Sequence, residues 1–313
     1  RTASCLQQKL FKKNWMKALK NNIEISYYSN FSKNEKKFIE SEIKEIAKKS
    51  IPSANIAHNV ELIHILNKAY SYQSEILLVY LDKEIIGFIL LSILNNKAIS
   101  LPHFSYGGCF GVLKLTDSLK DKITKSLSIK FSGGFLIRDF EPYSKNIFTE
   151  KVTYSLSLEK SSADQFILLN KKLRSQVRKA IKNDITVEIG CLEDFYKIYT
   201  KNMHRKHGSP HLSYDFFNNL VNSYSSGETQ IFVTKYNKKV VGSSIVVGYQ
   251  DFIEVCWAAT LIEYNYLSPN MLQYWTMISH AIDNNYKIFS FGRTTIGSGS
   301  QKFKKQWGTT EIP

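Results

Sequence analysis

The sequence predicts a mixed α/β (α+β) protein with two tandem domains of one type, each a mixed, mostly antiparallel sheet flanked by helices. The 313 residues are 43% hydrophobic and 13% aromatic, which is enough apolar material for roughly two packed cores at ~150 residues per domain. One pattern also occurs twice. An apolar strand, a polar turn, two β-branched residues, a glycine and a second strand follow one another around Gly87 and again around Gly242. The two glycines lie 155 residues apart, about half the chain, which favours a duplication.

In the first half, residues 34–49 predict an amphipathic helix and residues 58–70 a second one. Residues 75–93 predict a hairpin that turns at Asp82-Lys83-Glu84, and residues 229–247 predict its repeat. A glycine inside a strand indicates a bulge or a close approach of two backbones. The apolar side of the first helix is expected to contain Phe38, Ile39, Ile43, Ile46 and Ala47.

The domain boundary is expected in the polar stretch 159–164, which follows a predicted strand at 151–158 and divides the chain into domains 1–160 and 161–313. The second domain then opens with a predicted helix over 164–183. Its apolar stripe would consist of Leu169, Leu173, Val177 and Ile181, and the basic stripe beside it of Lys171, Arg174, Arg178 and Lys182. Arginine forks bind phosphate at two points, which favours anion binding, although a solvated charged face explains the same stripe.

The rest of the second half continues the α/β order. Helices are expected at 194–205 and 213–224, with Ser213 as N-cap of the latter. A strand is expected at 251–260. Ser268-Pro269-Asn270 predicts the start of another helix, because proline is tolerated in a first turn. A last strand is expected at 287–291.

The tail combines glycine with positive charge. Gly292-Arg293 ends the last predicted strand, a glycine- and serine-rich loop follows, and a cationic segment closes with Trp307-Gly308. Backbone amides freed by glycine form an anion site together with Arg and Lys. Phe303 and Trp307 lie four apart, on one face of any helix formed there. A surface loop leading to a terminal helix anchored by these two aromatic residues explains the same pattern.

Charge and cysteine content narrow the function classes. The net charge of +15 and the pI near 9.4 favour phosphate-rich partners such as tRNA, nucleotide-linked substrates or anionic membrane surfaces. No run of about 18 apolar residues predicts a transmembrane helix. Scattered cysteines without zinc spacing favour a reducing cytoplasm and no structural metal; they are Cys5, Cys109, Cys191 and Cys256.

A series of short motifs occurs in one order through the second half. The first half contributes Leu101-Pro-His-Phe-Ser-Tyr-Gly-Gly108. The second-half motifs are Leu173-Arg-Ser-Gln-Val-Arg-Lys-Ala180, Phe195–Tyr199 with Met203, Gly242, Leu267–Asn270, Phe291-Gly-Arg293, Phe303-Lys304 and Trp307-Gly308. Together they resemble the FemABX family of peptidoglycan-bridge aminoacyltransferases, which have two GNAT-type (N-acetyltransferase-like) domains. The resemblance covers most of residues 70–308.

The resemblance implies a tandem GNAT fold and transfer of an aminoacyl group from aminoacyl-tRNA to an amine, such as that of a cell-envelope precursor, without a tightly bound cofactor. It places catalysis at Lys304, as the cation that stabilises charge in the transition state, and at Phe303 beside the donor. Substrate binding is expected at Tyr106, Gly107, Gly108, Arg174, Arg178, Asn270, Gly292, Arg293, Lys302 and Trp307.

The chain also departs from that family. An acidic residue that some members carry after the first-domain glycines is replaced here by Cys109-Phe110-Gly111, so no carboxylate base is assigned. Two alternatives remain. The donor could be acyl-CoA or an acyl carrier protein, although Arg293 and Gly297 only approximate the CoA pyrophosphate motif. Alternatively, the protein could be a basic protein that binds nucleic acid or a membrane surface and catalyses no reaction.

Overall fold

The computed structural model describes residues 23–49, 55–111, 115–140, 142–144, 147–225 and 227–312. The chain forms two compact units that alternate along the sequence. The first contains residues up to 52 together with 72–102 and 106–147, and the second contains 53–71, 103–105 and 148–313. A single domain boundary near residue 160 stays a prediction.

The first unit is built on a sheet in the order β1-β2-β3-β4-β6, with β5 paired to β3. The pairings are antiparallel except between β4 and β6, which run parallel. Ile123 and Leu127 of its second helix are fully buried in the core of this unit, with Leu77 and Ile89 from the sheet. Its elements are β1 (Ile23–Tyr27), α2 (Lys33–Lys49), β2 (Gln73–Leu81), β3 (Glu84–Leu94), β4 (Lys97–Ser100), β5 (Phe110–Gly111), α4 (Asp117–Lys130) and β6 (Phe135–Leu136).

The second unit has a seven-stranded sheet in the order β13-β7-β12-β11-β10-β9-β8. Only β11 and β12 pair in parallel among its described strands. The strands are β7 (Lys151–Ser157), β8 (Thr186–Ile189), β9 (Glu228–Tyr236), β10 (Lys239–Tyr249), β11 (Phe252–Thr260), β12 (Ile288–Thr295) and β13 (Thr310–Ile312).

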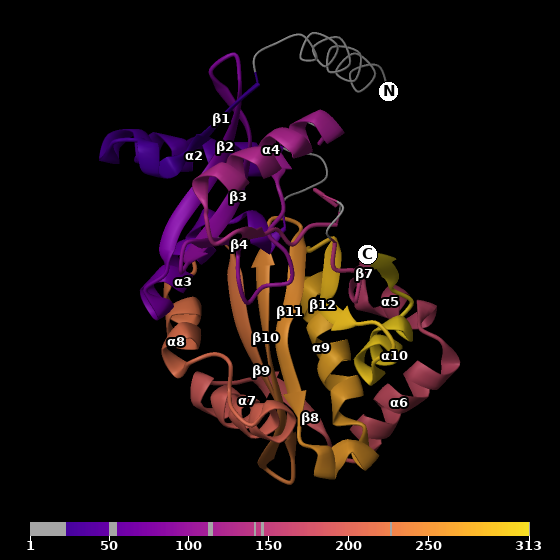
Figure 1. Ribbon diagram of the computed structural model, residues 1–313. Coiled ribbons are helices and arrows are strands. Elements are labelled where there is room, and N and C mark those ends of the chain that lie inside the picture. Colours follow the sequence, from indigo (N-terminus) through magenta and orange to yellow (C-terminus); the bar gives the residue numbers. More distant parts are fainter. Residues whose placement is uncertain are drawn as a thin grey trace, which may run out of the picture. The chain divides into compact units, whose positions relative to one another are not determined.

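Helix α9 packs on this sheet, and α5 and α6 pack against α9 in turn (Figure 1). The helix α7 contacts β10 and β11, and α3 packs against α8. The core includes Phe289, Phe291 and Trp307, none of them more than 1% exposed. The helices are α3 (Val60–Tyr70), α5 (Ser162–Leu168), α6 (Lys171–Lys182), α7 (Leu192–His207), α8 (Tyr214–Ser223), α9 (Pro269–Asp283) and α10 (Gly299–Lys305).

The repeated hairpin is present in both units with the same irregularity. Each hairpin turns through two residues with positive φ, Asp82-Lys83 in one and Asn237-Lys238 in the other, as two-residue turns of this kind require. Each second strand then carries a bulge just before its glycine, where one residue has no partner in the register. The bulge expected at this glycine is therefore confirmed, and a Cβ on Gly242 would lie 2.7 Å from the Gln273 side chain.

Four expectations about single elements are corrected. The helix predicted over 164–183 is two helices, because Leu169 is extended and the Asn170 side chain caps α6 by accepting from the Leu173 amide. Ile181 is 56% exposed, and Ala180 takes its place in the core. Phe38 is 63% exposed, unlike the other apolar residues of α2. The last predicted strand continues to Thr295, since its bulge keeps it paired with β7.

Candidate functional site

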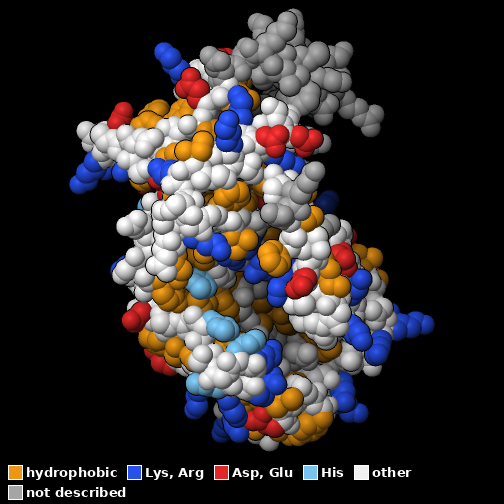
Figure 2. Space-filling model, viewed as in Figure 1, with side chains coloured by type: hydrophobic (Ala, Val, Ile, Leu, Met, Phe, Trp, Pro, Cys, Tyr) orange, Lys and Arg blue, Asp and Glu red, His pale blue; other side chains and the backbone are white. Residues whose placement is uncertain are grey.

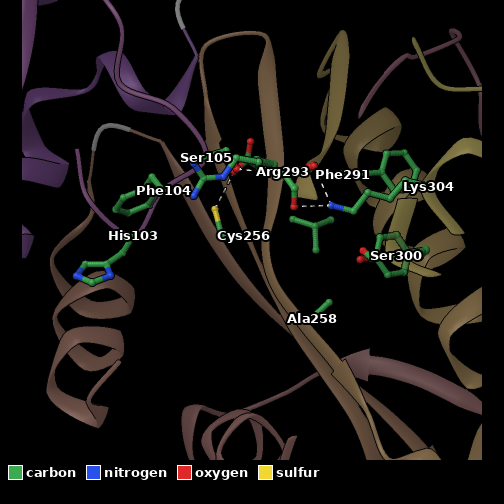
Figure 3. A pocket seen from close by; sticks show the side chains of 13 residues that line it. His103, Phe104, Ser105, Cys256, Ala258, Phe291, Arg293, Ser300 and Lys304 are labelled. Carbon is green, nitrogen blue, oxygen red and sulfur yellow. Dashed lines mark hydrogen bonds between the residues drawn. The ribbon is translucent and has the colours of Figure 1, made fainter. Parts of the chain in front are cut away.

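A cavity opens in the second unit where two neighbouring strands part. Strands β11 and β12 pair in parallel as far as Glu254 and Ser290, and both strands then continue. The cavity has a volume of about 270 Å³, and both strands contribute to its lining (Figure 3). Its walls are Val255, Cys256 and Ala258 from β11, Phe291, Gly292 and Arg293 from β12, and His103, Phe104, Ser105, Glu254, Tyr274, Ser300 and Lys304.

The bulge in β12 shapes one wall of this cavity. Its register against β7 shifts between Ser290 and Arg293, and Gly292 has a φ of +68°. A side chain is strained in that conformation, and a Cβ at Gly292 would lie 3.2 Å from the Val255 carbonyl. The bulge lets two successive carbonyls, those of Gly292 and Arg293, accept hydrogen bonds from one lysine.

That lysine is Lys304 of α10. Its Nζ donates to the Gly292 carbonyl at 2.8 Å and to the Arg293 carbonyl at 3.1 Å. The residue is only 6% exposed. Burial lowers the pKa of Lys304 to about 8, and the negative charge of Glu254 opposes this shift. An ammonium group has three N–H donors, so one remains for a ligand in the cavity.

Glu254 supplies a buried carboxyl group to the same cavity. It is 1% exposed, and it accepts hydrogen bonds from Ser105 Oγ at 2.6 Å and from Ser290 Oγ at 2.9 Å. Burial raises its pKa, while the two hydroxyl donors and the charges of Lys304 and Arg293 lower it. Ser105 Oγ also accepts from the Arg293 amide at 3.3 Å. The carboxyl group is therefore fixed in place by both strands and the 103–105 segment.

The arrangement places a proton acceptor and a cation in one water-poor cavity. A carboxylate with a raised pKa accepts a proton more readily at neutral pH than an exposed one. An ammonium group held in place by two carbonyls stabilises a developing oxyanion without reorganising. Together, the two groups can take a proton from an attacking amine and stabilise the oxyanion formed from an ester or thioester.

Part of the chain is similar to a known protein family. The family described as "Acetyltransferase (GNAT) domain" matches residues 170–305. The predicted resemblance to the FemABX family is also confirmed, and so is the predicted fold class.

The relatives point to the same family. The UDP-N-acetylmuramoylpentapeptide-lysine N(6)-alanyltransferase of Weissella viridescens is 25% identical over 125 residues, which are 39% of this chain and only 37% of that enzyme. The crystal structure of FemX superposes with a TM-score of 0.63 at 13% identity, over 87% of this chain and 93% of FemX. A tandem GNAT protein from the clavulanic acid biosynthesis pathway superposes with a TM-score of 0.52 at 7% identity, over 92% and 95% of the two chains.

The cavity brings together three of the site residues expected from the sequence, Gly292, Arg293 and Lys304. Phe303 and Trp307 lie beside it in the core. Both rings pack on Tyr274, which lines the cavity, with ring centroids 4.8 Å and 6.1 Å away. The two aromatic residues therefore anchor α10 in the core, as one of the two interpretations of the sequence expected. Any contact of Phe303 with a donor stays a prediction.

Other predicted binding residues do not line the cavity. Lys302 is exposed on α10, and Asn270 lies in the first turn of α9. On α6, the Arg178 guanidinium lies 5.4 Å from the centre of the Phe166 ring, and Arg174 Nη1 contacts the Ile167 carbonyl at 3.5 Å. The substrate-binding roles of these four residues stay predictions.

Tyr106, Gly107 and Gly108 belong to the first unit. The Gly107 amide donates to the Arg138 carbonyl at 2.8 Å. A Cβ on Gly108 would lie 2.0 Å from the Asp139 carboxylate, so within this unit the glycine allows a close backbone approach. The neighbouring residues 103–105 belong to the second unit instead, where Ser105 contacts Glu254.

Sequence reasoning did not find Glu254 or Ser105. One signal for Glu254 was available, because it is the single charged residue of the otherwise apolar or neutral strand 252–260, and an isolated charge in a buried strand is expensive unless it has a role. Ser105 lies inside the motif at 101–108, but substrate binding was assigned there only to Tyr106, Gly107 and Gly108. Its contact with Glu254 spans 149 residues.

Membrane-spanning helices and metal-binding clusters are both absent from the described part of the chain. Among those residues, none of the helices is long and apolar enough to cross a membrane. In the same ranges, no group of three or more His, Cys, Asp or Glu side chains is placed to hold a metal ion. Cys109, Cys191 and Cys256 are free thiols, and Cys5 lies outside the described residues.

Proposed function

We propose that this protein transfers an aminoacyl group from aminoacyl-tRNA to an amine acceptor such as a peptidoglycan precursor. The observation that carries the proposal is the pairing of Glu254 and Lys304 in one cavity of a GNAT domain. The alanyltransferase of Weissella viridescens, whose name specifies the lysine of a UDP-N-acetylmuramoylpentapeptide, supports the aminoacyl donor and the amine acceptor.

The reaction uses both buried groups. The acceptor nitrogen attacks the ester carbonyl of the donor, a C–N bond forms, and the carbonyl oxygen becomes an oxyanion that the free N–H of Lys304 stabilises. Glu254 takes the proton that the nitrogen loses. When the C–O bond breaks, this proton passes to the departing ribose oxygen, which leaves an amide and an uncharged hydroxyl group.

Residues around the cavity would position the donor. The exposed Arg293 guanidinium and Lys302 supply positive charge for phosphate near the cavity and on α10. Phe303 packs on Tyr274, and through it shapes the wall that the donor would contact. Tyr106, Gly107 and Gly108 of the first unit remain predicted substrate-binding residues.

Acyl-CoA or an acyl carrier protein is the alternative donor, and one observation favours it. The loop from Arg293 to Gly299 ends at the start of α10, where Ser298 is the N-cap, and free amides at a helix start suit a pyrophosphate. The tandem GNAT protein of the clavulanic acid pathway, described in its form without AcCoA, has the same fold. We place the reaction in the cytoplasm, where charged tRNA and acyl-CoA are both available.

The donor can be identified directly. The purified protein is incubated with a pool of charged tRNAs, and separately with acyl-CoAs, each with lysine-containing peptidoglycan precursor as acceptor. We expect acceptor-dependent loss of the aminoacyl group from tRNA and amide formation on the precursor. Consumption of acyl-CoA alone would replace the proposal with the alternative donor. Salt-sensitive tRNA binding without consumption of any donor would show a binding protein.

Two variants test the residue roles. Lys304→Met and Glu254→Gln each remove one charge from the cavity, and each is expected to lower the transfer rate by about 10²-fold or more. Lys305→Met is the matched control, because Lys305 is exposed on the same helix and pairs with Glu311 instead. A rate for Lys304→Met within about threefold of the unmodified protein, worth under ~1 kcal/mol, would end the assignment of the lysine.

A further inference from the structure

Helices α5 and α6 present a basic and partly apolar face that lies outside the cavity. From residue 165 to residue 183 the chain contains six Lys or Arg residues and no Asp or Glu. The same segment has three large apolar side chains in contact with solvent: Ile167 is 67% exposed, Leu168 66% and Ile181 56%.

The arginine residues of α6 reach toward α5, the helix that ends with Ile167 and Leu168. The buried residues of α6 are Leu173, Val177 and Ala180, which pack toward α9. Arg174 and Arg178 lie one turn apart and point to α5, because one contacts the Ile167 carbonyl and the other the Phe166 ring. Ile181 follows Arg178 by three residues, so it lies on that side too.

Lys171 and Lys182 extend this side at either end of the helix, three residues before Arg174 and four after Arg178. We call the set Ile167, Leu168, Lys171, Arg174, Arg178, Ile181 and Lys182 the α5–α6 face. The two remaining cations of α6, Lys172 and Lys179, are seven residues apart and lie on the opposite flank. Figure 2 shows Lys and Arg side chains projecting from the part of the second unit where Figure 1 places α6.

We propose that the α5–α6 face docks on an anionic lipid bilayer. Cations attract anionic lipid headgroups, and each contributes about 1 kcal/mol close to such a surface. Exposed isoleucine and leucine side chains among them enter the boundary between headgroups and acyl chains. A nucleic acid would also bind the cations, but it would not bury the three exposed apolar side chains. A bilayer binds both kinds of side chain, so we favour the bilayer.

The face is outside the cavity, and its proposed role does not depend on the transfer reaction. None of its seven residues lines the cavity. The α6 helix reaches the site only indirectly, since Asn170 Nδ2 donates to the Gln306 carbonyl just after α10 at 3.0 Å. Docking through this face would keep the GNAT domain at a membrane surface while its cavity binds substrates.

The test measures vesicle binding without any substrate. The protein is sedimented with vesicles of phosphatidylcholine alone, or with 30 mol% phosphatidylglycerol added, at about 0.15 M salt. We expect binding only to the anionic vesicles. Ile167→Ser with Leu168→Ser should weaken that binding about tenfold, and Lys171→Gln with Lys182→Gln should weaken it by a similar factor.

Matched controls exist in the same unit. Ile189→Ser removes an apolar side chain that is 66% exposed on β8, and Lys172→Gln with Lys179→Gln removes two charges from the other flank of α6. Both should stay within threefold of the unmodified protein. Ile181→Ser provides a second apolar variant at a position that is exposed, so folding does not depend on it.

A filter-binding assay with bulk tRNA separates the two anionic partners. The serine variants are expected to retain tRNA binding while they lose vesicle binding. The proposal is overturned if the serine variants bind vesicles as well as Ile189→Ser does. It is equally overturned if the variant Lys171→Gln with Lys182→Gln loses tRNA binding but keeps its binding to anionic vesicles.

Discussion

Lys304 and Glu254 are the residues on which the proposed chemistry depends. Each is almost fully removed from water, and each has its ordinary pKa shifted by burial in the direction of its uncharged form. The opposite charge of each group opposes the shift of the other, and the hydroxyl groups of Ser105 and Ser290 also oppose it in Glu254. Such perturbed pKa values are typical of a functional site.

The pKa of Lys304 gives a prediction for stability. The folded protein releases this proton near pH 8, whereas an unfolded lysine keeps it to about pH 10.4. Between these values the unfolded state binds more protons, so folding stability rises with pH. We compare the unfolding free energies of the unmodified protein and Lys304→Met, measured by urea unfolding. Their difference is expected to change by about 1 kcal/mol in favour of the unmodified protein between pH 7 and pH 9.

The same pKa sets the direction of the activity profile. If the protonated amine stabilises the oxyanion, the transfer rate of the unmodified protein divided by that of Lys304→Arg should fall as the pH rises through about 8. The ratio cancels the ionisation of the acceptor amine. A ratio that rises through pH 8 would instead assign the lysine as the base.

At the scale of elements, the site depends on an irregularity in one strand. The β12 bulge turns Gly292 to a positive φ and lets two consecutive carbonyls bind Lys304. A regular strand alternates its carbonyls between opposite directions. The parting of β11 and β12 then opens the cavity next to the bulge, so one deformation of the sheet creates both the space and the lysine site.

Gly292→Ala tests this element. The left-handed conformation costs a side chain roughly 1–2 kcal/mol, and the new Cβ would lie 3.2 Å from the Val255 carbonyl. We expect a comparable loss of stability in thermal unfolding and a transfer rate lowered more than tenfold, because the two carbonyls move away from Lys304.

Gly297→Ala is the control for this strain. Its φ is +79°, and nothing lies within 4 Å of a new Cβ. It should lose similar stability and keep its rate within about threefold. Equal losses of rate in both variants would contradict the role of the bulge and would direct attention to the loop that the alternative acyl-CoA donor would use.

At the scale of the whole molecule, each unit has a hydrophobic core of its own among the described residues. Leu127 is fully buried in the first core and Met277 in the second. Truncation of either to alanine is expected to cost about 2–5 kcal/mol. Hydrogen exchange followed by mass spectrometry should show Leu127→Ala losing protection in β2 and β3 while β9 and β10 keep theirs.

The reverse pattern is expected for Met277→Ala. We expect each core to stabilise only its own unit. Equal loss of protection in both sheets after either substitution would contradict this, because it would mean that the two units unfold together.

Local patterns determined most of the elements. The repeated hairpins with Gly87 and Gly242, the helix capped by Ser213 and the helix that opens at Pro269 are all where the sequence predicts them. These features depend on neighbours a few residues apart, namely alternation, turn chemistry and capping. Lys304 was singled out through a motif and it lines the cavity, while its catalytic role stays a prediction.

Only the tertiary structure decided the rest of the site. Glu254 lies 50 residues from Lys304 in the chain, and Ser105 lies 149 residues from Glu254. Their proximity results from strand order and from the parting of β11 and β12, neither of which is written in a local pattern. The exposure of Ile181 also depends on how α6 packs on α9, whereas the break at Leu169 follows from the local cap at Asn170. The sequence by itself determined which elements form and where positive charge gathers. Burial, which raises the pKa of the carboxyl group and lowers that of the amine, arises only once the elements pack and exclude water.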